Sequence, residues 1–149
     1  MNKIDCFDKE YAFLSNFYDS PLYISGFKFK NSEAAFQAMK TIDLNQRAKF
    51  CDLPPNEAKR LGRQITLRPD WEDVKDEIMY QVVFAKFSQN KDLALDLIAT
   101  GECELIEGNW WHDNTWGDCS CDKCANIIGE NHLGRILMRV REDVKRLCL

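Results

Sequence analysis

The sequence predicts a single, mainly helical domain with a small β-hairpin near its N-terminus. Its 149 residues fall within the usual size of one domain. Short apolar segments with strand-like alternation come early in the chain, and apolar residues at helical spacing dominate the rest. No internal repeat, low-complexity stretch or Gly/Ser-rich linker divides the chain, so we expect one domain over residues 1–149.

The predicted hairpin covers residues 22–30. Its arms are Leu22–Ile24 and Phe27–Lys30, and apolar and polar residues alternate in the second arm. Ser25–Gly26 lies between the arms and supplies the glycine that tight hairpin turns favour.

Six helices are predicted downstream of the hairpin. Asn31 and Ser32 cap the first, Asp70 caps the longest, and Gly101 closes the fifth. Apolar residues recur at helical spacing in the fourth and sixth. The expected ranges are 33–42, 44–50, 54 to 62 or 63, from 71 onward, 91–100, and from 131 onward.

A long connection from Glu107 to Glu130 separates the last two predicted helices. Connections of this length are uncommon in compact domains and are usually functional or disordered. Three of the four tryptophans lie in it, at Trp110, Trp111 and Trp116, which favours a functional role.

Charge and composition exclude several classes of protein. The net charge of −4 and the pI near 5.2 argue against a protein that coats duplex nucleic acid, although a local basic pocket for a phosphorylated ligand is compatible with them. No apolar run approaches the roughly 18 residues that a membrane span needs. The N-terminus lacks a signal sequence, and the seven cysteines fit reduced thiols, so we expect a cytoplasmic protein with no membrane partner.

One helix carries a polar stripe. Glu33, Gln37 and Lys40 stand at positions i, i+4 and i+7, so they share one face of the predicted helix 33–42. A solvated outer face would show the same pattern, so the spacing alone does not define a site.

Eight segments of the chain follow one another in the order and spacing of a known family. They are Phe13–Tyr18, Ser32–Lys40, Ala58–Arg63, Arg68–Trp71, Ala85–Phe87, Leu105–Glu107, Trp116–Gly117 and Asn131–Met138. From about residue 7 to 145, the sequence resembles the NADAR, or YbiA-like, family of N-glycosidases.

The resemblance implies a mainly helical α+β fold of the YbiA-like type and hydrolysis of a bond between ribose C1 and a nitrogen. Known substrates in the family are phosphorylated ribosylamino intermediates of riboflavin synthesis and ADP-ribose attached to guanine in nucleic acid or nucleotides. The family's acid and lysine fall on Glu33 and Lys40, and its aspartate before Trp-Gly falls on Asp113. We expect no cofactor.

The chemistry assigns distinct roles to these residues. Glu33 can protonate the departing nitrogen or stabilise an oxocarbenium-like transition state. Lys40 can capture C1 as a Schiff base if burial or a neighbouring cation lowers its pKa. The alternatives for Lys40 are a surface ion pair with Glu33 and an electrostatic clamp for a phosphate.

Further residues are candidates for binding the substrate. Asp113 can polarise a ribose hydroxyl or activate water, and a tryptophan such as Trp116 can stack on a base or lie in the core. Arginines at 60, 63, 68 and 135 can hold phosphate, and Asn16 can line the pocket or form a local turn. The substrate-binding set is Asn16, Phe17, Gln37, Arg68, Trp71, Trp116, Asn131 and Arg135.

The cysteines at 119, 121 and 124 suggest a zinc site with His112 or His132. Structural zinc sites usually pair one CxxC with a second pair at a distance, and no second CxxC exists here. We therefore expect no metal. Two alternative functions remain: a non-catalytic module that binds ADP-ribose or a nucleotide, and a zinc-dependent nucleic-acid-binding module. The leaving base and the oligomeric state stay open.

Overall fold

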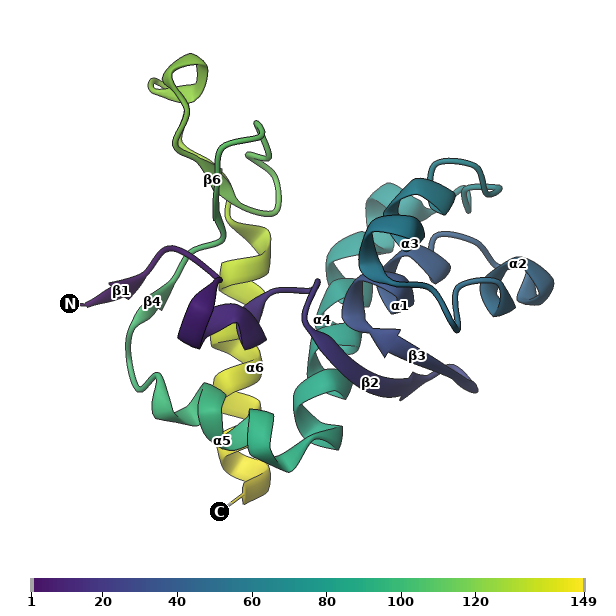
Figure 1. The fold of residues 1–149 in the computed structure, drawn as a ribbon, viewed down its shortest axis with the longest axis horizontal. Coiled ribbons are helices and arrows are strands. Elements are labelled where there is room, and N and C mark those ends of the chain that lie inside the picture. Colours follow the sequence, from purple (N-terminus) through teal and green to yellow (C-terminus); the bar gives the residue numbers. More distant parts are fainter. Residues whose placement is uncertain (1, 149) are drawn as a thin grey trace. The chain divides into compact units, whose positions relative to one another are not determined.

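The computed structural model describes residues 2–148, and helices dominate it, which confirms the predicted mainly helical α+β class (Figure 1). The chain divides into two compact units. One unit contains residues 16–91, and the other contains the N-terminal residues up to Ser15 together with the chain from Asp92 onward. Among residues 2–148, no helix is both long enough and apolar enough to cross a membrane.

The unit of residues 16–91 begins with the predicted hairpin. Strands β2 (Asp19–Ile24) and β3 (Phe27–Asn31) pair antiparallel, with Leu22 opposite Phe29. Ser25 and Gly26 both have positive φ, at 52° and 83°, as tight hairpin turns of the right twist require. Leu22 and Phe29 are fully buried, so the hairpin presents one apolar face to the core of its unit.

Helix α1 (Ser32–Ala38) is the centre of this unit. It contacts both hairpin strands, α2 (Leu44–Ala48), α3 (Pro55–Leu61) and α4 (Trp71–Gln89) (Figure 1). Ala34, Ala35 and Ala38 are fully buried, and their small side chains allow neighbouring elements to approach α1 closely. Burial on all sides, rather than amphipathicity, fixes this short helix, because seven residues are too few to be stable alone.

The predicted helix 33–42 is too long at its C-terminal end. The backbone N–H groups of Lys40 and Thr41 bond to the carbonyls three residues back, at Gln37 and Ala38. This tight turn ends α1 and places Lys40 just beyond the helix. The helix at 44–50 likewise ends earlier than predicted, at Ala48.

Asp70 stands at the position before α4, but its side chain makes no capping hydrogen bond there. Its carboxylate accepts instead from Arg68, so the predicted capping role of its side chain is wrong. The fourth helix itself is present, and it ends at Gln89.

The second unit combines short strands with two helices. Strand β1 (Lys3–Ile4) pairs in parallel with β4 (Glu104–Leu105), and a 3-10 helix, η1 (Lys9–Leu14), lies upstream of the hairpin, where no helix was predicted. Helix α5 (Lys91–Ala99) is closed by Gly101, whose φ is +65°. Helix α6 (His132–Cys148) contacts β4 and buries Leu133, Leu137 and Val140 along one face.

The connection from Glu107 to Glu130 contains more structure than the sequence suggests. Strands β5 (Gly108–Asn109) and β6 (Asp118–Cys119) pair in parallel, and η2 (Asp122–Cys124) follows. Gly117 packs so closely on the carbonyl of Glu107 that no side chain fits at this position. The connection is therefore an ordered loop with its own short strands and close packing.

Candidate active site around α1

The N-terminus of α1 is fixed by two asparagines. The side-chain oxygen of Asn31 accepts from the backbone N–H of Ala34 at 2.7 Å, and its amide donates to the carbonyl of Leu53 at 3.0 Å. The carbonyl of Asn16 accepts from the backbone N–H of Glu33 at 3.1 Å. The bonds to Ala34 and Glu33 satisfy backbone N–H groups that the start of a helix leaves without a partner, and they fix the position of Glu33 at the start of α1.

Asn16 contributes its side chain to the same junction. Its Oδ1 accepts from Ser32 Oγ at 2.9 Å, and its Nδ2 lies 3.4 Å from Met79 Sδ. The residue is only 8% exposed. The sequence suggested either a pocket residue or a local turn, and the structure shows a third arrangement, in which Asn16 joins the chain before the hairpin to α1.

Glu33 and Gln37 are joined by a hydrogen bond. Gln37 Nε2 donates to Glu33 Oε2 at 2.8 Å, and Gln37 is 5% exposed while Glu33 is partly buried. Gly62 lies against the side-chain oxygen of Gln37, and a Cβ at Gly62 would collide with it. The polar stripe is thus packed into the unit, and a solvated outer face does not describe it.

Lys40 lies close to an aromatic ring and to other cations. Its Nζ is 5.9 Å from the centre of the Trp71 ring, and the residue is partly buried. Burial lowers the pKa of Lys40; Arg63 and Lys59 lower it further, and the negative charge of Glu33 opposes them. The net direction is downward, which is the change that an amine nucleophile requires.

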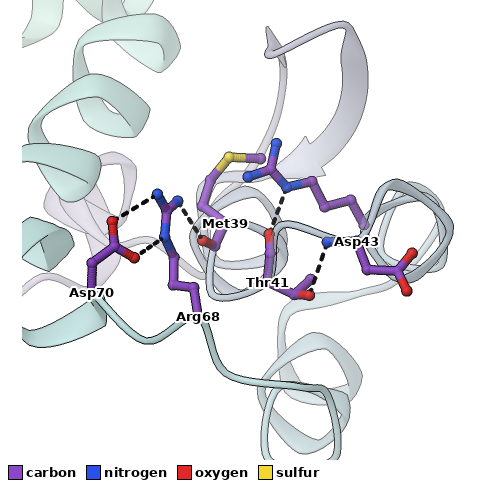
Figure 2. Close-up of polar contacts among 6 residues, drawn as sticks. Met39, Thr41, Asp43, Arg68 and Asp70 are labelled. Atoms are coloured by element: carbon purple, nitrogen blue, oxygen red, sulfur yellow. Dashed lines mark hydrogen bonds and ion pairs between the residues drawn. The ribbon is translucent and has the colours of Figure 1, made fainter.

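The turn that carries Lys40 is held in place by Arg68 and Arg47 (Figure 2). The backbone N–H of Arg68 donates to the carbonyl of Lys40 at 2.7 Å. Arg68 Nη1 donates to the carbonyl of Met39 at 3.4 Å, as Figure 2 shows. Arg47 Nε donates to the carbonyl of Thr41 at 2.7 Å. The turn is therefore held at three successive carbonyl groups.

Figure 2 also shows how the guanidinium of Arg68 is used. Its Nε and Nη2 donate to the two carboxylate oxygens of Asp70, at 2.7 and 3.2 Å. The hydrogen bond from Arg68 and its positive charge hold the pKa of the Asp70 carboxyl below its ordinary value, although the small desolvation of the group opposes them. This fork occupies the edge of Arg68 that would otherwise bind phosphate in a bidentate manner.

The two remaining candidates of this unit are aromatic and differ in exposure. Trp71 is 7% exposed and packs on Phe36, with ring centres 5.1 Å apart. Phe17 is 45% exposed, and the ammonium of Lys59 lies 5.9 Å from its ring centre. Phe17 therefore presents ring surface to solvent, whereas Trp71 is a buried ring that faces the ammonium group of Lys40.

The candidates on the long loop and α6 belong to the other unit. Asp113 Oδ1 accepts from the backbone N–H groups of Thr115 and Trp116, at 3.1 and 2.9 Å. The Trp116 ring meets His132 edge-on at 5.7 Å. Arg135 is exposed on the first turn of α6.

Asn131 uses both ends of its amide on backbone groups. Its Nδ2 donates to the carbonyl of Leu105 at 2.9 Å, and its Oδ1 accepts from the N–H of Glu107 at 3.0 Å. Its φ is +52°, and the next glycine of the helix, Gly134, packs against the same amide and the carbonyl of Leu105. These contacts connect the start of α6 to the end of β4.

A buried lysine was missed by the sequence analysis. Lys86 is 1% exposed, and its Nζ lies 5.6 Å from the ring centre of Tyr18 and 5.1 Å from that of Phe87. Burial lowers its pKa from 10.5 to about 7. The sequence pattern did indicate this burial. Lys86 follows Met79, Val82 and Val83 at helical spacing, at a position where a core residue is expected.

Comparison with known proteins identifies the family to which this chain belongs. Residues 5–145 match the NADAR domain, and the chain belongs to the NADAR family. N-glycosidase YbiA of Escherichia coli is 36% identical over 91% of this chain and 82% of its own length. N-glycosidase Npun_R5314 of Nostoc punctiforme is also 36% identical, over 92% of this chain and 88% of its own. These relatives place the chain among enzymes that hydrolyse N-glycosyl compounds.

Two further matches are a solved structure and a longer protein. The solved structure of E. coli YbiA has a TM-score of 0.82 with this chain at 33% identity, and the match covers 99% of this chain and 89% of YbiA. Riboflavin biosynthesis protein VVA0006 of Vibrio vulnificus is 38% identical over 93% of this chain, which spans only 37% of the Vibrio protein. The expected family and its α+β fold are therefore confirmed.

Proposed function

We propose that this chain hydrolyses the bond between ribose C1 and a nitrogen in a phosphorylated ribosyl or ADP-ribosyl substrate. The hydrogen-bonded pair of Glu33 and Gln37, with Lys40 one turn further on, carries the proposal. The N-glycosidase relatives support the reaction, and the name of the Vibrio protein, which refers to riboflavin biosynthesis, is compatible with ribosylaminopyrimidine phosphates as one substrate class. Because one family match covers residues 5–145, we further propose that both units act as one domain.

In this proposal, Glu33 is the general acid. It donates its proton to the departing nitrogen as the C1–N bond breaks, and the resulting carboxylate then takes a proton from the attacking water. The hydrogen bond from Gln37 Nε2 orients the carboxyl group, since it fixes one of the two oxygens. Free sugar and free base are the products, and Glu33 returns to its acid form.

Lys40 is the proposed nucleophile. Its neutral amine bonds to C1, and the leaving nitrogen departs with the proton from Glu33. One proton then passes from Nζ to the ring oxygen as the sugar opens to a protonated imine between C1 and Nζ. Water then adds to C1, which releases the sugar and the amine. The partial burial of Lys40 and the neighbouring charges of Arg63 and Lys59 support this role, because they favour the neutral amine.

The phosphate end of the substrate has a separate set of candidates. Lys59 and Arg63 are exposed, and both influence Lys40 electrostatically, so their charges lie near the proposed nucleophile. Arg68 is assigned a positioning role instead, because its fork holds Asp70 and its backbone holds the Lys40 turn. Phe17 offers exposed ring surface for a base, whereas Asn16 and Trp71 are buried and hold the neighbouring residues of the site in position.

For the other unit, the roles implied by the family remain proposals. Asp113 is proposed to polarise a ribose hydroxyl or activate water, Trp116 to stack on a base, and Arg135 to contact phosphate. The hydrogen bonds at Asn131 favour structural support of α6 over contact with substrate.

The proposal is tested by direct assay. The protein is incubated with an oligonucleotide carrying ADP-ribosylated guanine and, separately, with ribosylaminopyrimidine phosphates, and the products are identified by mass spectrometry. We expect release of an unmodified base or aminopyrimidine together with the free phosphorylated sugar from at least one substrate. The alternative is a non-catalytic module, which would bind one of these compounds and leave its C1–N bond intact over the same period.

A further inference from the structure

Four metal-binding side chains converge in the loop between α5 and α6. They are His112, Cys119, Cys121 and Cys124, and their nitrogen and sulfur atoms all lie within 4.8 Å of one another. His112 Nδ1 is 3.2 Å from Cys121 Sγ and 3.5 Å from Cys124 Sγ. Ligands on one tetrahedral zinc ion, with bonds of about 2.0–2.3 Å, lie roughly 3.5–3.8 Å apart, so the four groups already have nearly the required spacing.

The backbone of the loop brings the ligands together. The pairing of β5 with β6 brings Asn109 beside Cys119, and the N–H of Ser120 donates to the carbonyl of Asn109 at 2.7 Å. Asn114 Oδ1 accepts from the N–H of Cys119 at 2.9 Å. His112 has a φ of +71°, a costly conformation for a residue other than glycine, and it belongs to the turn that carries its ring to the cysteines.

Hydrogen-bond donors surround two of the sulfurs. The backbone N–H groups of His112 and Cys121 lie 3.3 and 3.5 Å from Cys119 Sγ, and Asn114 Nδ2 lies 3.2 Å from Cys124 Sγ. Cys119 and Cys124 are each only 5% exposed. Donors directed at buried sulfur stabilise the thiolate form, and outer contacts of this kind hold ligands in position around a metal.

We propose that His112, Cys119, Cys121 and Cys124 bind one zinc ion in a tetrahedral site. Three thiolates and one imidazole match the ligand preference of zinc, and four protein ligands leave no open position, as in a structural site. On binding, the three thiols lose their protons to solvent, and His112 binds through Nδ1 with its proton on Nε2. The missing second CxxC is no objection, because Cys119 and His112 supply the other two ligands from neighbouring turns.

The zinc would act on the loop and not on the chemistry. Asp113 follows His112 directly, and Trp116 lies in the segment between His112 and Cys119. A metal that joins residues 112 and 119 closes this segment into a ring, which lowers the entropy that it can gain by opening. The site does not depend on the proposed glycosidase activity, since neither Glu33 nor Lys40 belongs to it.

Metal content is the first test. The full chain is purified without chelator, under reducing conditions, and its metal is measured by mass spectrometry. We expect about one zinc per chain. Replacement by cobalt(II) should give the thiolate charge-transfer band and the intense visible absorption of a tetrahedral ion. Protein free of metal that takes up no cobalt with its thiols reduced would overturn the proposal, as would iron in place of zinc.

Matched cysteine variants make the test specific. Cys121→Ser and His112→Ala should lose zinc, whereas Cys6→Ser, Cys51→Ser and Cys148→Ser, which alter cysteines outside the cluster, should retain it. Cys121→His keeps four ligands and should also retain the metal, which covers the case in which Cys121→Ser fails to fold. Equal zinc in Cys121→Ser and in the Cys148→Ser control would refute the site.

Discussion

The start of α1 and the loop from Glu107 to Glu130 both place polar side chains at fixed positions, but by different means. At α1, Ala34, Ala35 and Phe36 are buried, and a few hydrogen bonds from Asn16 and Asn31 set the helix within a packed core. In the loop, Trp110, Trp111 and Ile128 are exposed. There the chain is held by the short β5–β6 strand pair, by asparagine side chains and by hydrogen bonds to the sulfurs of Cys119 and Cys124. Packing fixes the first region, and polar cross-links fix the second.

Because the two regions are held in different ways, substitutions in them should have different effects. Side chains on α1 can change charge with little effect on a helix that its neighbours hold. Changes in the loop act on stability first, because few apolar contacts remain to compensate for a lost polar bond. The following substitutions test that difference.

The largest effect is expected for Glu33→Gln. Loss of the general acid should lower kcat about 10²–10⁴-fold, with the free energy of unfolding nearly unchanged, because glutamine has the same size. Steady-state kinetics and urea unfolding measure the two quantities. Glu57→Gln, on the exposed first turn of α3, is the matched control and should retain normal turnover. A folded Glu33→Gln enzyme with normal kcat would remove Glu33 from the mechanism.

Lys40→Arg is expected to lower kcat about 10²-fold or more, since arginine keeps the positive charge but does not become a nucleophile at neutral pH. Borohydride added during turnover should reduce the imine and leave a sugar-derived mass on Lys40, located by peptide mapping. Lys49→Arg, at the exposed end of α2, is the control for a charge-preserving change. Near-normal turnover of Lys40→Arg, with no adduct in the wild type, would refute the imine mechanism, and an oxocarbenium-like path would then be the remaining mechanism.

Asn131→Ala tests the loop region. Loss of the bonds to Leu105 and Glu107, together with a positive φ that alanine tolerates poorly, should lower the free energy of unfolding by about 2–4 kcal/mol. Asn131→Gly should recover part of this loss, because glycine accepts the positive φ. Urea unfolding gives the stabilities, and KM gives the second readout. A normal stability with a raised KM would assign Asn131 to substrate binding instead.

Lys86 should make the stability of the protein depend on pH. Its folded pKa of about 7 lies below the ordinary 10.5, so between these values the unfolded chain holds a proton that the folded chain lacks. Stability from this group therefore rises with pH across that window, by at most about 1.4 kcal/mol per pH unit, and is lowest below pH 7.

Lys86→Met should remove this slope. The gain in stability of the variant over wild type should be larger at pH 7 than at pH 9.5, as measured by urea unfolding at both values. Lys91→Met, an exposed neighbour, should show no such difference. Parallel pH profiles for wild type and Lys86→Met would show that Lys86 keeps its proton in the folded chain.

Local chemistry made part of this protein predictable. Gly26 and the alternation after it defined the hairpin, and Asn31 defined the start of α1, because turns and caps depend on neighbouring residues. The Glu33 stripe and the family motifs pointed to α1, the helix on which we propose the active site. The C-terminal end of α1 was not predictable, because Arg68, which is distant in sequence, holds the turn at residues 39–41 together with Arg47.

By itself the sequence determined the helical α+β class, the family and the residues worth examining. Tertiary structure alone decided how those residues are used. It set the backbone of Arg68 against the carbonyl of Lys40, buried Lys86 beside the ring of Tyr18, and brought His112 to three cysteines. The physical reason is the same in each case. Burial, charge and ligand geometry depend on atoms that the chain brings together from distant positions, whereas periodicity and capping depend only on residues a few positions apart.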